Sequence, residues 1–418
     1  MFKSIKIIAA TTILTCLVYI SSAQNDYDKA IKIADRIIEN TSFKIIDSES
    51  KELFDSTEGL SIEKKYKIES PYNMWHYWNG VLALAMIELS ERTGDEKYKE
   101  YSRKNYEFIF DNLDYFGKQF DTGIKDISIY QHFEMGLLDH CGAMSAGLCE
   151  VYKFDSKPEY ETYLNKAINY VSNEELRFED GTFIRRTPRK MTLWADDLYM
   201  CVPFLARMAE KTGDSKYIDD AIFQVKNFNK YLVNKSNGLY FHGYFGDNGQ
   251  NSVAHWGRCN GWIVMAETDL ISQLPDNHPE KQNLIKTLES HLVSLSRFQD
   301  VSGMWHQIID KPDSYLESSA TAMFIYCIAK AVNKGWIKPT YAAIAISGWG
   351  GLSKNITDDG QVENICIGTG IRDNIQYYYT RETKLNDIHG LGAIIMAGTE
   401  MKKLSENIKS LREKMLNE

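Results

Sequence analysis

Several familiar ligand-binding patterns are missing from this 418-residue sequence, and each absence argues against a class of protein. The seven cysteines include no Cys-x-x-Cys pair, and the nine histidines form no group at metal-ligand spacing, so we expect no metal centre. The 48 basic residues are outnumbered by 57 acidic ones, with no basic stripe, which argues against a nucleic-acid partner. No apolar run beyond residue 20 is long enough to span a membrane.

The first 23 residues have the layout of a secretory signal peptide. Two lysines precede the almost entirely apolar Ile7–Ile20, and small residues lead to a plausible cleavage point after Ala23. Lipidation at Cys16 is an alternative, but Thr15 is a poor residue before a lipidated cysteine. We therefore predict a signal peptide over residues 1–23, export with the periplasm as the expected compartment, and no membrane anchor.

A repeated turn reveals the internal organisation of the chain. The stretch Glu91–Tyr98 recurs as Glu210–Tyr217, and each copy indicates a helix end, a left-handed glycine, an aspartate cap and a new helix. The same separation of 119 residues relates Trp75 to Trp194. Such a separation indicates two units of about 60 residues each.

Six helical hairpins account for the whole chain beyond the signal peptide. Apolar helical segments rich in small residues begin 56 to 72 residues apart, at Trp75, Leu138, Trp194, Arg258, Glu317 and His389. Amphipathic segments lie between them, at Tyr27–Glu39, Lys97–Asn112, Glu159–Val171, Lys216–Val233, Pro279–Arg297 and Pro339–Ile346. Because a helix apolar all round is buried and one with a polar face lies outside, we predict an all-α (α/α)6 barrel as a single domain over residues 24–418. A solenoid is the alternative, although its repeats would be shorter and more uniform.

Polar and aromatic residues gather where the apolar helices begin. Five of the eight tryptophans lie in the starting segments Tyr72–Asn79, Leu138–Gly142, Thr192–Met200 and His255–Trp262. In a ring of hairpins these segments open on one face, and aromatic rings suit the C–H faces of sugars. The pattern predicts a carbohydrate site at this mouth of the barrel.

Two carboxylates at this mouth are candidates for acid–base chemistry. Asp139 and Asp196 begin consecutive inner helices, and helix capping is the structural alternative for both. Asp197 points about 100° away from Asp196 round a helix, so one of the two has a structural role. His242 lies in an aromatic loop, where an ordinary surface histidine is the alternative.

Basic residues near the mouth indicate an anionic ligand. Arg258 stands between Trp256 and Trp262, where a guanidinium suits a bidentate contact to a carboxylate, with an interhelical salt bridge as the alternative. A basic run that ends at Lys190 precedes Asp196; such runs are usually solvated, but this one stands where an anionic substrate would approach.

Three motifs resemble those of a known family. Leu138–Gly142, Trp194–Met200 and Arg258–Trp262 resemble signatures of the unsaturated rhamnogalacturonyl hydrolases, glycoside hydrolase family 105, which is related to the unsaturated glucuronyl hydrolases of family 88. Cys366–Gly370 and Asp387–Gly392 are similar to the closing segments of that family. The resemblance covers residues 28 to 404 and implies an (α/α)6 barrel.

The resemblance also implies an activity and roles for the candidate residues. Family members remove a terminal 4,5-unsaturated uronic acid left by a polysaccharide lyase, without a metal or organic cofactor. Asp196 would be the general acid/base and Asp139 its partner. The substrate-binding residues would be Trp75, Lys190, His242, Trp256, Arg258 and Trp262. The expected partner is an anionic unsaturated oligosaccharide, of the rhamnogalacturonan or the ulvan type.

Three other functions are compatible with the same barrel. An inverting glycosidase would need two well-separated carboxylates. A sugar epimerase would need paired histidines at the mouth, for which His76, His140, His242 and His255 are available. A non-catalytic oligosaccharide-binding protein would not require both Asp139 and Asp196.

Overall fold

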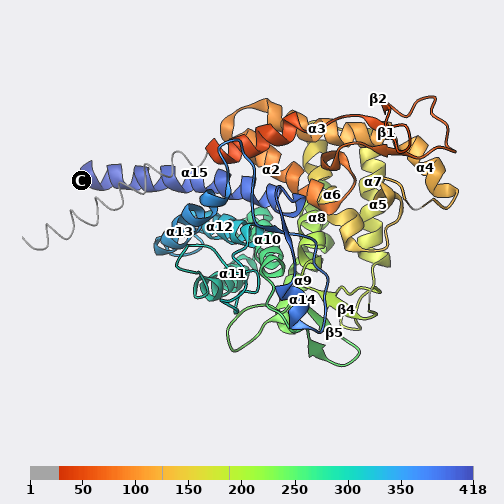
Figure 1. Cartoon of the computed structure of the whole chain (residues 1–418). Helices are drawn as coiled ribbons and strands as arrows, with labels where there is room; N and C mark the ends of the chain where they lie inside the picture. Colours follow the sequence, from red (N-terminus) through yellow and green to blue (C-terminus); the bar gives the residue numbers. More distant parts are fainter. Residues whose placement is uncertain (1–27, 125, 188, 418) are drawn as a thin grey trace, which may run out of the picture.

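A closed ring of six inner helices forms the body of the molecule. The computed structural model describes residues 28–124, 126–187 and 189–417. The inner helices are α2 (Tyr77–Thr93), α6 (Leu138–Tyr152), α8 (Asp197–Thr212), α10 (Gly257–Gln273), α12 (Ser318–Asn333) and α15 (Ile388–Asn417). Each packs against the next and α15 packs against α2, so the ring closes (Figure 1).

An outer layer of amphipathic helices covers the ring. It consists of a helix at residues 28–39 and of α3 (Glu96–Asp111), α7 (Pro158–Asn169), α9 (Ser215–Leu232), α11 (Lys281–Ser296) and α13 (Ala342–Leu352). α3, α7, α9, α11 and α13 pack against α2, α6, α8, α10 and α12 respectively, and the helix at 28–39 contacts α15 where Ala30 meets Gly398. The prediction of an (α/α)6 barrel is confirmed, and every inner helix starts within three residues of its predicted position.

The repeated turn has the predicted local structure at both sites. Gly94 and Gly213 end α2 and α8 in the left-handed conformation, with φ of 73° and 72°. The following aspartates, Asp95 and Asp214, accept hydrogen bonds from backbone N–H groups in the first turns of α3 and α9. These turns are local, which is why the sequence alone identified them.

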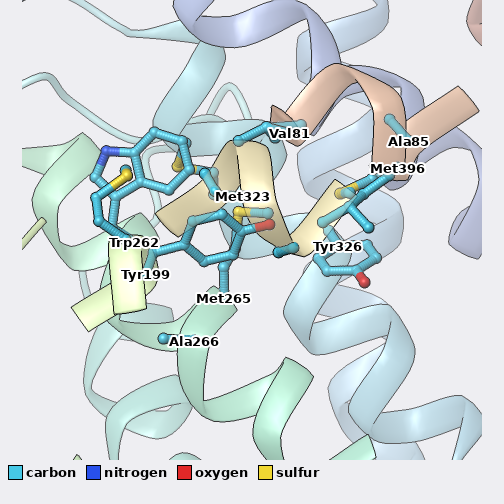
Figure 2. Packing of buried hydrophobic residues seen from close by; sticks show 14 of the residues in the cluster. Val81, Ala85, Tyr199, Trp262, Met265, Ala266, Met323, Tyr326 and Met396 are labelled. Atoms are coloured by element: carbon cyan, nitrogen blue, oxygen red, sulfur yellow. The ribbon is translucent and has the colours of Figure 1, made fainter. Parts of the chain in front are cut away.

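Side chains from five inner helices fill the axis of the barrel. Figure 2 shows Val81 and Ala85 of α2, Tyr199 of α8, Trp262, Met265 and Ala266 of α10, Met323 and Tyr326 of α12, and Met396 of α15. Small residues let the helices approach closely. A Cβ atom at Gly142 of α6 would lie 1.4 Å from the Met200 carbonyl oxygen of α8.

Short strands occur in the loops of the described chain. β1 (Ile45–Asp47), β2 (Leu53–Phe54) and β3 (Tyr66–Ile68) form one sheet, and β7 (Ile365–Cys366) pairs with β8 (Thr383–Lys384). A third sheet has β5 (Gly243–Phe245) between β4 (Thr192–Trp194) and β6 (Gln250–Asn251), all antiparallel. Trp194 pairs with Gly243, and the Ala195 N–H donates to the His242 carbonyl at 3.0 Å. This sheet therefore brings Asp196 and His242 to the same place.

Shorter helices complete the loops. They include α4 (Leu113–Asp121), α5 (Tyr130–Phe133) and α14 (Ile375–Tyr379). The cysteines of the described residues are all buried and unpaired. The predicted signal peptide lies outside the described residues. Within them, no helix has the length and apolarity needed to cross a membrane.

Candidate active site

Asp196 lies at the N-terminus of α8 but does not cap it. Its backbone is helical and its carboxylate makes no capping hydrogen bond. Oδ2 is buried and lacks a hydrogen bond within the described chain, although His242 Nε2 is 3.2 Å away. The side chain keeps 14% of its surface exposed, so a substrate has access to it. A carboxylate in this position is available for proton transfer.

His242 is held between Asp196 and a tyrosine from a distant part of the chain. Its Nδ1 lies 2.9 Å from the hydroxyl of Tyr378 in α14, and that hydroxyl accepts from the Arg372 N–H at 3.4 Å. Because an ionised carboxylate only accepts and Asp196 Oδ2 lies 3.2 Å from Nε2, we assign the His242 proton to Nε2, which leaves the Tyr378 hydroxyl to donate to Nδ1. His242 is completely buried and tilted against Trp256, at 4.6 Å between centroids. It is therefore a positioned site residue and not a surface histidine.

Arg185 joins the other two aspartates. It donates to both carboxylate oxygens of Asp197, at 2.6 to 3.1 Å, and to Asp139 Oδ1 at 2.9 Å. Asp197 is only 1% exposed, while the Asp139 side chain is 21% exposed. Burial raises the pKa of the Asp197 carboxyl, and the Arg185 guanidinium opposes that shift. Asp197 thus has a structural role, and Asp139 is oriented by Arg185 rather than used as a cap.

Arg258 is fixed beneath the same mouth by backbone carbonyls. It donates to the Cys366 oxygen at 2.5 Å and the Ile367 oxygen at 2.7 Å, and its guanidinium lies 4.6 Å from the Trp256 ring centroid. Arg258 forms no interhelical salt bridge in the part of the chain that the structure describes. Of the five N–H donors of a guanidinium, three are bound here, the third by Ser319 Oγ at 3.2 Å, so two remain, and the side chain is 1% exposed.

The remaining predicted residues differ in their exposure. Trp256 and Trp262 are 2% and 1% exposed, and Trp262 packs between Tyr199 inside the barrel and Tyr77 toward the mouth. Lys190 is exposed and no contact links it to the aspartates. It follows Arg189, which lines a neighbouring cavity.

The position of Trp75 does not support its predicted contact with substrate. Trp75 is 1% exposed and its Nε1 donates to the His140 carbonyl at 2.9 Å. The ring packs against His132 and Tyr163, so it fills the core beneath α2. Trp78, one helical turn further, is partly exposed at the mouth. The start of α2 lies two residues later than predicted, at Tyr77.

Other site residues escaped the sequence analysis. Trp78 stacks on His76 and contacts His389, which is hydrogen-bonded to Asp387. The hydroxyl of Tyr77 interacts electrostatically with Arg258, Asp139 and Asp196, and burial raises its pKa. The motifs Tyr72–Asn79 and Asp387–Gly392 indicated this region, but nothing local pointed to Tyr378.

The described residues contain no group of three or more histidines, cysteines, aspartates or glutamates arranged to hold a metal ion. The groups available for chemistry at the mouth are the Asp196 carboxylate, the Asp139 carboxylate held by Arg185, and His242. Tyr77 and Tyr378 add two hydroxyl groups. This set suits proton transfer to and from a sugar.

Known proteins share this sequence pattern and fold. The model of Glycosyl Hydrolase Family 88 matches residues 51–405. The chain is 26% identical over 330 residues to the unsaturated rhamnogalacturonyl hydrolase YesR of Bacillus subtilis, covering 76% of this chain and 86% of YesR. It is 28% identical over 313 residues to an unsaturated 3S-rhamnoglycuronyl hydrolase of Alteromonas sp., covering 68% and 72%.

Solved structures agree with the sequence comparisons. A glycoside hydrolase of family 105 from C. acetobutylicum has a TM-score of 0.68 at 26% identity, over 80% of this chain and 95% of that one. A possible family 105 member from Salmonella enterica has a TM-score of 0.71 at 24% identity, over 90% and 93%. The fold and the relatives define a glycoside hydrolase. The chain belongs to Glycosyl Hydrolase Family 88, and the resemblance to family 105 is confirmed.

Proposed function

We propose that this enzyme removes a terminal 4,5-unsaturated uronic acid from lyase-generated oligosaccharides in which the uronate is linked to rhamnose. The printed names of two relatives support this substrate class, since they act on unsaturated rhamnogalacturonyl and 3S-rhamnoglycuronyl compounds. The observation that carries the proposal is the Asp196 carboxylate, whose buried Oδ2 lacks a hydrogen bond in the described chain and lies beside His242.

Asp196 is the acid and then the base. The unsaturated ring is a vinyl ether, so a proton transferred from Asp196 to C4 forms a C–H bond and leaves oxocarbenium character at C5. The resulting Asp196 carboxylate takes a proton from a water molecule while the oxygen of that water bonds to C5. The hemiketal so formed opens, and the glycosidic bond is lost with it. The reaction therefore differs from the displacement at C1 used by two-carboxylate glycosidases.

Asp139 is the partner carboxylate of Asp196 and orients the water that attacks C5. Arg185 holds the Asp139 carboxylate with a charge-assisted hydrogen bond of 2.9 Å, which orients it. The Nε2–H of His242 lies 3.2 Å from Asp196 Oδ2 and steadies the carboxylate after proton transfer.

The remaining contacts bind the sugar. Arg258 has guanidinium donors for the uronate carboxylate, and Trp256 lies directly beside it. Trp78 and Tyr77 are partly exposed at the mouth and offer aromatic surfaces to a sugar. The partner is thus an anionic oligosaccharide and not a nucleic acid. The pattern of residues 1–23 supports export, with the periplasm as the compartment.

The decisive measurement follows the ultraviolet absorbance of the conjugated C4=C5 bond. We expect lyase products of rhamnogalacturonan or of ulvan to lose absorbance with the wild-type enzyme. Asp196→Asn should fold normally and lower kcat by at least about 100-fold, because it removes the transferable proton. Asp214→Asn is the matched control. Asp214 likewise stands at the start of a helix, the outer-layer α9 next to α8, and asparagine caps a helix equally well.

The outcomes separate this function from its rivals. Cleavage of saturated uronides without loss of absorbance would indicate a conventional glycosidase. Binding without any turnover would indicate a carbohydrate-binding protein. Undiminished turnover by Asp196→Asn would contradict the role given to Asp196.

A further inference from the structure

A buried glutamate at the start of α12 is connected to Arg258. Glu317 precedes that helix and is only 1% exposed. Among the described residues it forms no ion pair, so hydrogen bonds must replace the hydration of its charge. The two carboxylate oxygens accept, at 2.6 to 3.0 Å, from the Ser319 hydroxyl and from the N–H groups of Ser319, Ala320 and Cys366.

Helix capping explains only part of this arrangement. The N–H groups of Ser319 and Ala320 lie in the first turn of α12, where a capping side chain binds. Short side chains are preferred for this task, and Asp95 and Asp214 cap α3 and α9 in this way. The longer side chain of the glutamate reaches one donor more, the Cys366 N–H, which is 49 residues further along the chain. Capping does not require that contact.

All three hydrogen bonds that Arg258 forms within the described chain depend on this carboxylate. The guanidinium donates to the carbonyls of Cys366 and Ile367, on the backbone that Glu317 holds at the Cys366 N–H. The third acceptor is the Ser319 hydroxyl at 3.2 Å, which donates its own proton to Glu317. Glu317 therefore fixes every acceptor that orients the guanidinium.

The charges of the two side chains also compensate each other. Arg258 is 1% exposed, so its cation is buried as deeply as the Glu317 anion. The two groups interact electrostatically, with the Ser319 hydroxyl between them. A buried cation is costly without an opposite charge nearby. The carboxylate thus keeps Arg258 charged and in one orientation before a substrate arrives.

We propose that Glu317 is a positioning residue for Arg258 and holds its guanidinium in the orientation that receives the uronate carboxylate. Glu317 is buried and acts through Arg258, not on the substrate. The inference rests on the proposed function, since that function assigns Arg258 to the uronate carboxylate. A side chain that is fixed in advance loses little conformational entropy on binding, so its contact adds more to the affinity for the substrate.

The test compares an unsaturated uronide with its methyl ester, which lacks the negative charge that Arg258 binds. kcat/KM is measured for each by loss of ultraviolet absorbance, and the ratio of acid to ester reports the contact with Arg258. Glu317→Asp keeps the charge and a preferred capping residue, but is one methylene too short to reach the Cys366 N–H as well. We expect the ratio to fall about 10-fold, mainly through a higher KM for the acid.

Ser319→Ala is a second variant, which leaves the Glu317 side chain in place. It removes the hydroxyl bridge, while the hydrogen bonds of Glu317 to the first turn of α12 and to the Cys366 N–H remain. We expect the ratio to fall about 3-fold, because one of the three hydrogen bonds of Arg258 is lost.

Glu280→Asp is the matched control. Glu280 also precedes a helix, α11, but it makes no capping hydrogen bond and forms a partly exposed ion pair with Lys226 at 2.9 Å. This substitution should leave the ratio unchanged.

The outcomes distinguish positioning from capping. Equal losses of kcat/KM on acid and ester in Glu317→Asp, or no loss on either, would overturn the inference and leave the proposed function intact. If that variant does not fold, an unchanged ratio in Ser319→Ala would overturn it in the same way. Failure of the wild-type enzyme to remove the absorbance of the acid would instead contradict the proposed function, and this inference with it.

Discussion

Asp196 and Asp197 are neighbours in the sequence with opposite surroundings. Asp197 is 1% exposed and bound through both oxygens to Arg185. Asp196 keeps one oxygen without a hydrogen bond in the described chain and is partly exposed. The rotation of about 100° per residue in a helix is enough to direct one carboxylate into the protein and the other toward the mouth.

Tyr378 is a positioning residue for His242, and its hydroxyl can be removed alone. Tyr378→Phe keeps the ring that packs on His242 but deletes the group at 2.9 Å from Nδ1. We expect kcat to fall about 10-fold to 100-fold, because a buried group left without its hydrogen bond costs about 1–3 kcal/mol. KM should change less, since Tyr378 does not touch the substrate. Steady-state kinetics separate the two parameters.

Tyr379→Phe is the control on the same helix. The Tyr379 hydroxyl donates to Asp313 at 2.8 Å in an exposed position, so its loss should leave kcat close to the wild-type value. Equal effects of the two substitutions would show that Tyr378 acts only through the stability of α14.

The contact between α6 and α8 depends on one glycine. Gly142→Ala would place a methyl group 1.4 Å from the Met200 carbonyl oxygen, so the two helices must separate. We expect a loss of about 1–3 kcal/mol in the free energy of unfolding. Activity should fall as well, because Asp139 is carried by α6 and Asp196 by the start of α8. Denaturant unfolding and kcat/KM measure the two effects.

A second helical glycine provides the comparison. A Cβ atom at Gly350 of α13 would have no heavy atom within 4 Å. Gly350→Ala should therefore raise stability by up to about 1 kcal/mol, through helix propensity alone. Similar losses in both variants would mean that the close approach of α6 and α8 is not what Gly142 provides.

Buried histidine makes the stability of the whole molecule depend on pH. His132 is 7% exposed, its two ring nitrogens have no hydrogen bond in the described chain, and burial lowers its pKa to about 3. Below pH 6.5 the unfolded chain therefore binds a proton that the folded chain does not. This one group should lower the free energy of unfolding by up to about 1.4 kcal/mol for each pH unit between 6.5 and 3.

His132→Phe should reduce that slope, because phenylalanine fills the same aromatic cluster without a titratable nitrogen. Urea unfolding of both proteins at pH 7 and pH 4.5 provides the measurement. Tyr163→Phe is the control, since Tyr163 stacks on His132 and burial raises its pKa well away from this range. If His132→Phe and the wild type lose stability in parallel, other groups govern the acid response.

The architecture of the whole molecule follows from local patterns in the sequence. Apolar helices rich in small residues recur every 56 to 72 positions, and the turns at Gly94 and Gly213 mark hairpin boundaries. Both signals depend on neighbouring residues only. Burial of an all-apolar helix then requires an outer layer, so a double ring could be predicted before any contact was known.

The site was predicted only in part, because local signals cannot place side chains across the ring. Asp139, Asp196 and His242 stand in recognisable motifs, and the structure brings Asp196 and His242 together. Trp75 was predicted at the start of an inner helix, but α2 starts two residues later and Trp75 is 1% exposed.

The sequence by itself determined the barrel, the family and the residue types at the mouth, because these depend on periodicity and on motifs within single segments. The tertiary structure decided which carboxylate lacks a hydrogen bond and which residues hold the others. Arg185 reaches Asp139 across 46 residues, and Tyr378 reaches His242 across 136. Such partners are determined by the closure of the ring, which brings together the loops of different hairpins.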